Sequence, residues 1–353
     1  MIMETKILTW NQLDEIAAIL KKGGIVIFPT ETVFGMGCIA SCEKAYARLL
    51  GTKKRQPDKP FTLMCSNLTQ IAMHAEVDKN TIAVMKEFMP GSITLLLKAR
   101  KGLEERFTLG QKTIGVRVPD SKEVRDLIDK VGCPLFVPSA NLSGEPPITS
   151  FEEAKKQFDG VVDAIVEGNC ADKKASTIVD LSKAEPALVR EGPVSFGTIK
   201  GVYGADKKTL VALGSDHGGY TYKEAIKEHL LDMGYDVYDA GTNSKDSCDY
   251  PIFAIDAAKK VASKEAELGV LVCTSGEGIA IAANKVKGIR CGIGYDDVAT
   301  GKTREHNDAN MVAFGEAYMK LDDVLRRVDI FLSEAFSTEA KHSRRVQEIK
   351  SAE

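Results

Sequence analysis

A cysteine in the second half of the chain is followed by residues suited to work on an anionic substrate. Cys273 ends the apolar run 269–272, and Ser275, Gly276 and Gly278 come directly after it. The run predicts a buried parallel strand, and the alanine-rich stretch behind the turn suits a helix. Glycines let backbone N–H groups approach an anion, and a helix N-terminus favours negative charge. The same field favours a thiolate, which is the form of cysteine that acts as a base.

A lone cysteine beside a tight turn is more often structural than catalytic. Whether Cys273 is functional therefore depends on the residues that are expected to lie near it. Residues 209–213 predict a strand, and helices alternate with further strands from there towards the C-terminus. This alternation favours a doubly wound parallel sheet, which binds ligands at the carboxyl ends of its strands. Asp216 and His217 follow the first strand. They are therefore expected at the same sheet edge as Cys273, which favours a functional cysteine.

Cations, hydroxyls and an amide recur in the first half. Lys53, Arg55 and Lys59 lie in a predicted basic loop, which suits either a phosphate clamp or a solvated surface. Ser139 and Asn141 follow an apolar run two residues apart, so their side chains should point to one face of a strand end. Such groups are what a triphosphate with magnesium needs, which favours the clamp.

Length and composition limit the class of protein. The 353 residues predict two domains. Apolar residues make up 44% and charged residues 27%, and the formal net charge is −3. This is the composition of an ordinary soluble globular protein. Its small negative net charge gives no overall positive potential that would attract nucleic acid or an anionic membrane. No apolar run reaches the length of a membrane span, and the N-terminus lacks the layout of a signal peptide. We therefore expect a cytoplasmic protein that binds neither membrane nor DNA stably.

The cysteines and histidines give no sign of a metal centre. The eight cysteines form no CxxC pair and fit reduced thiols. The five histidines are too scattered for a zinc site. We predict no metal held by protein side chains.

The composition changes between residues 195 and 208, where three glycines stand among polar residues. This predicts a linker. We place the linker at 204–208, between a first domain at 1–203 and a second at 209–353.

The first domain resembles the YrdC-like threonylcarbamoyl-AMP synthases. The resemblance is carried by Lys53-x-Arg55 together with Ser139-x-Asn141, after the segment PTETVFGMG at 29–37. It implies a twisted α/β fold with an open, positively charged cavity.

The resemblance implies that L-threonine, bicarbonate and ATP are joined to threonylcarbamoyl-adenylate and pyrophosphate. The product would pass to downstream machinery for the t6A modification of tRNA, and ATP with Mg²⁺ would be a substrate. Cations would stabilise the charge that develops as a carbamate oxygen attacks the α-phosphate. The residues assigned to ATP and threonine by the resemblance are Thr30, Thr32, Lys53, Arg55, Lys59, Arg117, Ser139, Asn141, Ser176 and Arg190. An RNA-binding module is the alternative, which the slight acidity of the chain disfavours.

The second domain resembles ribose-5-phosphate isomerase of type B. The shared motifs are GSDHGG at 214–219, DYP at 249–251, the stretch 273–285 and REHNDAN at 304–310. The resemblance implies a Rossmann-like fold and the interconversion of ribose 5-phosphate and ribulose 5-phosphate without a cofactor.

By the resemblance, His306 would assist ring opening and Cys273 would move the proton through an enediolate. Ser275, Asn307 and the backbone N–H groups of the turn would stabilise the enediolate oxygen. The residues expected to contact the sugar phosphate are Asp216, His217, Tyr250, Gly276, Gly278, Lys341 and Arg345. Some members carry a glutamate base at the position of Ile279, so this chain is of the cysteine type.

Lys341 stands where many members have arginine, and it lacks the bidentate fork of a guanidinium. A hexose 6-phosphate of the allose or galactose type is therefore an alternative substrate. In the family, His306 and the C-terminal basic residues meet the cysteine of a neighbouring subunit, which implies at least a homodimer.

Overall fold

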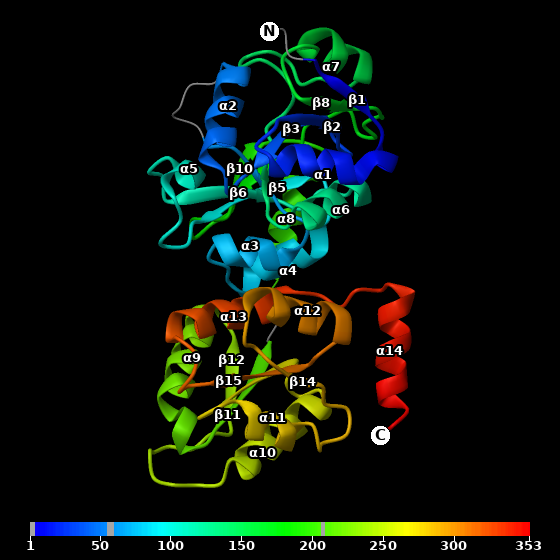
Figure 1. The fold of residues 1–353 in the computed structure, drawn as a ribbon. Helices are drawn as coiled ribbons and strands as arrows, with labels where there is room; N and C mark the ends of the chain where they lie inside the picture. The colour runs from blue at the N-terminus through cyan, green and yellow to red at the C-terminus, as the bar shows by residue number, and fades with distance from the viewer. Residues whose placement is uncertain (1–3, 55–59, 206–208) are drawn as a thin grey trace. The chain divides into compact units, whose positions relative to one another are not determined.

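A computed structural model describes residues 4–54, 60–205 and 209–353. The chain divides into two compact units (Figure 1). The first comprises the residues up to Glu76 together with Glu87–Gly204, and the second Val77–Lys86 together with Ala205–Glu353. The domain limits placed at 203 and 209 stay a prediction, and residues 206–208 of the predicted linker lie outside the described part.

Among the described residues of the first unit, ten strands form one mixed sheet. Neighbouring pairs are parallel in some places and antiparallel in others, so this unit is α/β without being doubly wound. In spatial order the strands are β1 (Lys6–Leu8), β8 (Ala164–Val166), β2 (Val26–Pro29), β3 (Phe34–Ile39), β7 (Leu135–Phe136), β4 (Leu63–Met64), β6 (Thr113–Arg117), β5 (Ile93–Lys98), β9 (Thr177–Asp180) and β10 (Ala187–Arg190).

Amphipathic helices cover this sheet. Ile16 and Leu20 of one helix pack with Val124 and Ile128 of another against Phe28 of β2. Because these side chains recur every three or four residues, each helix buries one face. The helices before the second unit are α1 (Leu13–Lys21), α2 (Glu43–Lys53), α3 (Leu68–His74), α4 (Lys79–Phe88), α5 (Glu105–Thr108), α6 (Lys122–Val131), α7 (Phe151–Phe158) and α8 (Phe196–Tyr203).

Helix α8 was not predicted: its glycines were interpreted as part of a linker, but burial of Ile199 stabilises the helix, and the linker placed at 204–208 stays a prediction. Another local prediction was wrong. Lys53 was expected in a loop, but it is the last residue of α2, and the helix stops at Lys54, whose φ is 49°. Lys53 is therefore held on a helix.

The second unit is a parallel sheet with helices on both faces, as predicted. Its spatial order is β12 (Asp236–Asp239), β11 (Leu210–Ser215), β13 (Leu268–Cys273), β15 (Met311–Gly315) and β14 (Cys291–Ile293), and every neighbouring pair is parallel. Apolar residues of α10 and α11 pack on one face. Figure 1 shows α9 and α13 on the other. The helices are α9 (Tyr220–Asp232), α10 (Tyr250–Ala262), α11 (Glu277–Ala283), α12 (Asp297–Asn307), α13 (Leu321–Ser333) and α14 (Ala340–Lys350).

Gly219, at the start of α9, lies against the backbone of β13. A Cβ there would lie 2.5 Å from the carbonyl oxygen of Val272 and 2.9 Å from the nitrogen of Cys273. We expect Gly219→Ala to destabilise the protein by about 1–3 kcal/mol, because the helix must move away from the strand. The measurement is the urea midpoint followed by circular dichroism. Gly201→Ala is the control: a Cβ at Gly201 of α8 meets no atom within 4 Å. Equal midpoints for the two variants would contradict the contact.

Candidate active sites

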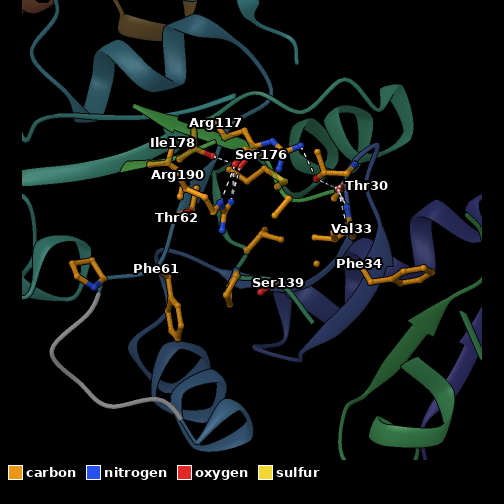
Figure 2. A pocket seen from close by; sticks show the side chains of 18 residues that line it. Thr30, Val33, Phe34, Phe61, Thr62, Arg117, Ser139, Ser176, Ile178 and Arg190 are labelled. Carbon is orange, nitrogen blue, oxygen red and sulfur yellow. Dashed lines mark hydrogen bonds between the residues drawn. The ribbon is translucent and has the colours of Figure 1, made fainter. Parts of the chain in front are cut away.

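A pocket in the first unit is formed where several strands of the mixed sheet end. Figure 2 shows its side chains converging from segments that are far apart in the sequence. Of the ten residues predicted for ATP and threonine, six line this pocket: Thr30, Thr32, Arg117, Ser139, Ser176 and Arg190.

Arg190 and Ser176 form one wall. The guanidinium of Arg190 donates to the backbone oxygen of Ser176 at 2.8 and 3.1 Å and to its Oγ at 3.3 Å (Figure 2). The Ser176 hydroxyl lies 2.9 Å from that of Thr94. Burial lowers the pKa of Arg190, and the nearby charge of Arg117 lowers it further. Arg190 brings a positive charge whose hydrogen-bond acceptors among the described residues are the neutral oxygens of Ser176, and this suits an anionic ligand.

Arg117 is anchored at the opposite wall. Its Nη2 donates to Oε1 of Glu31 at 2.5 Å and to Oγ1 of Thr32 at 2.9 Å. The Thr32 hydroxyl in turn lies 2.9 Å from that of Thr30. Glu31 belongs to the segment 29–37 but was not predicted as a site residue. Nothing in its local sequence indicates that it pairs with an arginine 86 residues away.

Lys53 and Asn141 lie behind the pocket wall and not on it. The Nζ of Lys53 donates to the backbone oxygens of Ser139 and Asn141 at 2.5 and 2.7 Å. The Ser139 hydroxyl donates to Oδ1 of Asn141 at 2.5 Å. These contacts hold the segment that presents Ser139. The other two cations of the predicted clamp, Arg55 and Lys59, lie outside the described residues.

In the second unit, Cys273 is the last residue of the central strand β13 and pairs with Gly315, the last residue of β15. Its Sγ accepts a hydrogen bond from the N–H of Gly276 at 3.1 Å. Gly276 has a φ of 85°, which a residue with a side chain rarely adopts. The turn thus directs a backbone donor at the sulfur. Ser275 accepts from the N–H of Glu277 at 3.3 Å.

The other predicted sugar residues surround this turn. A Cβ at Gly218 would lie 2.1 Å from Oγ1 of Thr274, so the turn that carries Asp216 and His217 packs against the cysteine turn. A Cβ at Gly278 would lie 2.8 Å from the ring of Tyr250. Because Gly218 and Gly278 have no side chains, the turn after β11 and the ring of Tyr250 can both pack closely against the cysteine turn.

Asp216 and His217 have defined partners. Asp216 accepts from the N–H of Gly218 at 3.1 Å, and burial raises the pKa of its carboxyl. The Nδ1 of His217 lies 3.1 Å from the backbone nitrogen and 3.2 Å from the backbone oxygen of Cys248, so Nε2 is the ring nitrogen left for a ligand.

His306 and Asn307 lie at the opposite edge of the sheet. They end α12, and Asn310 just beyond accepts from the N–H of Gly269 near the start of β13. A six-residue strand spans about 16 Å, so His306 does not reach Cys273 within one chain. The ring of His306 stacks on that of His342 at 4.0 Å between centroids. His342 belongs to α14, which also carries Lys341 and Arg345, both exposed.

The described residues contain no group of three His, Cys, Asp or Glu side chains placed to hold a metal ion. Among the same residues, no helix has the length and apolar character needed to cross a membrane.

Comparison with known proteins gives a separate family match for each half of the chain. Residues 18–192 match the family model of the Sua5, YciO and YrdC proteins, described as telomere recombination, and residues 211–349 match that of the ribose/galactose isomerases. The chain therefore belongs to both families, one in each half, and the two resemblances seen in the sequence are confirmed.

Relatives of the first half fall into two kinds. The uncharacterised protein YciO of Escherichia coli is 31% identical over 182 residues, which are 51% of this chain and 88% of YciO. Its crystal structure matches with a TM-score of 0.51 and 28% identity, over 55% of this chain and 97% of that one. The threonylcarbamoyl-AMP synthase of Bacillus subtilis is 33% identical over 196 residues, which are 55% of this chain but only 57% of the synthase.

The second half matches its relatives over their whole length. Ribose-5-phosphate isomerase B of Escherichia coli is 38% identical over 143 residues, which are 40% of this chain and 95% of the isomerase.

We expect His306 to titrate below its usual pKa of about 6.5. Burial lowers the pKa of His306, and the charge of Lys302 lowers it further. At pH 7 the ring is then neutral and can accept a proton. Lys302→Met should raise the midpoint, since it removes a positive charge. The measurement is an NMR titration of the imidazole. A midpoint above 6.5 in the wild type, or no rise in the variant, would contradict this electrostatic account.

Proposed function

We propose that the first half is an L-threonylcarbamoyladenylate synthase that uses threonine, bicarbonate and MgATP. The observation that carries this is the pocket lined by Arg117 and Arg190 among four predicted hydroxyl residues. Two guanidiniums and several hydroxyls suit the oxygens of a nucleotide and of a carboxylate. The relative named as a synthase supports the same reaction. The adenylate would then pass to the machinery that modifies tRNA.

In this reaction a carbamate oxygen attacks the α-phosphate and pyrophosphate leaves. The residues bind and orient, and no covalent nucleophile is required. Arg190 would stabilise the charge on the phosphate oxygens. Ser139, held by Asn141 and Lys53, would contact the substrate from the neighbouring wall.

Arg190→Met should lower kcat/KM for pyrophosphate release by about 10- to 100-fold, since a hydrogen bond to a charged group contributes about 1.5–3 kcal/mol. The assay omits threonine or bicarbonate in turn, and release should need both. Arg125→Met is the control, because Arg125 lies on α6 and bonds the backbone oxygen of Pro119. Release that is independent of threonine, or equal losses in both variants, would contradict the proposal.

We propose that the second half interconverts ribose 5-phosphate and ribulose 5-phosphate. The thiolate of Cys273 would take the proton from the carbon next to the carbonyl and return it to the neighbouring carbon. The N–H of Gly276, which donates to this sulfur, would help to hold it in place. Ser275 and backbone N–H groups would stabilise the enediolate oxygen.

The site would be completed by a second copy of the chain. Asp216, His217, Tyr250 and Cys273 gather at one sheet edge, whereas His306 lies at the other. A homodimer in which α12 and α14 of one subunit meet the cysteine turn of the other would supply the ring-opening histidine. It would also bring the positive charges of Lys341 and Arg345 to the phosphate.

Shared sites predict complementation between inactive chains. Cys273→Ala and His306→Ala should each abolish isomerisation. In a mixed dimer one site keeps both native residues, so an equal mixture that has exchanged subunits should recover about a quarter of wild-type activity. The measurement is ribulose 5-phosphate formation after co-refolding, with each variant refolded alone as control. No recovery, although mass spectrometry detects mixed dimers, would contradict the shared site.

Lys341 favours a second candidate substrate. The ammonium of a lysine meets a phosphate as a point charge, whereas the guanidinium of an arginine forms two parallel hydrogen bonds. Lysine therefore restricts the position of the phosphate less than arginine does. A six-carbon phosphate of the allose or galactose type would then fit as the alternative. Comparison of kcat/KM for the three sugar phosphates decides between them, and Lys341→Arg should favour ribose 5-phosphate if the fork matters.

A further inference from the structure

A buried ion pair stands behind the pocket of the first unit. Oε1 of Glu31 and Nη2 of Arg117 are 2.5 Å apart, and the side chains are 10% and 7% exposed. Arg117 lines the pocket, whereas Glu31 is absent from the described residues of its lining. Glu31 therefore acts on the contents of the pocket only through Arg117.

The backbone around Glu31 is fixed on both sides. The hydroxyl of Thr30 accepts from the N–H groups of Thr32 and Val33 and donates to the backbone oxygen of Val33 at 2.8 Å. The backbone oxygen of Glu31 accepts from the N–H of Asp172 at 2.7 Å. A turn held in this way gives the carboxylate a defined place from which to anchor a guanidinium.

The charge balance of the pocket depends on this carboxylate. Arg117 is close enough for its charge to lower the pKa of Arg190, in addition to the effect of burial. A buried cation is costly unless it is paired. Glu31 compensates Arg117, while among the described residues Arg190 donates to the neutral oxygens of Ser176.

The guanidinium of Arg117 is anchored to described side chains through one nitrogen, Nη2. Its Nε and the Oε2 of Glu31 are buried and have no hydrogen-bond partner among the described residues. Both of its hydrogen bonds to described side chains use Nη2. Buried polar atoms without a partner are rare in native proteins, so the Nε of Arg117 is a donor that an acceptor of a ligand would satisfy.

We propose that Glu31 is a positioning residue. It holds the guanidinium of Arg117 through Nη2, so that the remaining nitrogens meet an anionic oxygen of the substrate. That oxygen belongs to the carboxylate of the amino acid or to a phosphate of ATP, which present the same chemistry. The identity of the substrate rests on the synthase function proposed above, whereas the anchoring of Arg117 does not.

Two small substitutions separate geometry from charge. Glu31→Gln keeps the length of the side chain and an acceptor oxygen, and Glu31→Asp keeps the charge but shortens the side chain. Positioning predicts that Glu31→Asp raises the KM of one substrate at least about tenfold, as expected for one lost charge-assisted hydrogen bond. For Glu31→Gln it predicts a rise in that KM below about threefold. In both variants kcat should change less than KM. Glu167→Ala, at an exposed position, is the control.

The substrate whose KM rises identifies the oxygen: threonine indicates the carboxylate and ATP a phosphate. A larger loss in Glu31→Gln than in Glu31→Asp would overturn positioning and leave a role for charge alone. Equal rises for both substrates, in step with a lower melting temperature, would also overturn it.

A spectroscopic measurement tests the anchoring without reference to activity. In ¹H–¹⁵N spectra, a guanidinium held at Nη2 rotates slowly about its Nε–Cζ bond and gives separate Nη signals. The Arg117 signals are assigned by their loss in Arg117→Lys. They should be separate in the wild type and in Glu31→Gln, and averaged in Glu31→Asp. Averaged signals in the wild type would overturn the anchoring. A wild type that binds ATP but releases no pyrophosphate would instead contradict the proposed function alone.

Discussion

The common direction of the strands in the second unit is the constraint on which its chemistry depends. Every neighbouring pair is parallel, so all strands end at one edge, where Asp216 and Cys273 come together. The same direction sends α12 back to the other edge and carries His306 with it. In the proposed mechanism, a cysteine base and a histidine that assists ring opening would therefore have to come from two chains. Dimerisation would then be part of the proposed isomerase site.

In the first unit the main constraint is a different one, because several positive charges are buried inside a folded domain. Arg117 is paired with Glu31, Arg190 is bonded to the oxygens of Ser176, and Lys53 is bonded to backbone oxygens. Each cation is thereby fixed, but with different consequences. Arg117 and Arg190 reach the pocket, whereas Lys53 supports the segment that carries Ser139. Of these cationic motif residues, two therefore reach the pocket, and the third holds the backbone segment of a residue that lines it.

Local patterns in the sequence predicted much of this arrangement. The strand, turn and helix around Cys273 follow from an apolar run, glycines and alanines, and the parallel sheet follows from the alternation of strands and helices. Other features depend on tertiary contacts. Helix α8 was missed because burial of Ile199 outweighs its glycines. Glu31 was missed because its contact is with Arg117, which is distant in the chain. The bonds of Lys53 to backbone oxygens could not be predicted for the same reason, and its role in binding phosphate stays a prediction.

The central claim is that one chain carries two chemically independent sites. The most direct test measures pyrophosphate release and sugar-phosphate isomerisation on the same preparations of wild type, Arg190→Met and Cys273→Ala. The account predicts that the wild type has both activities, that Arg190→Met loses most of the first and keeps the second, and that Cys273→Ala does the reverse. A single substitution that abolishes both activities, or a wild type with only one, would contradict it.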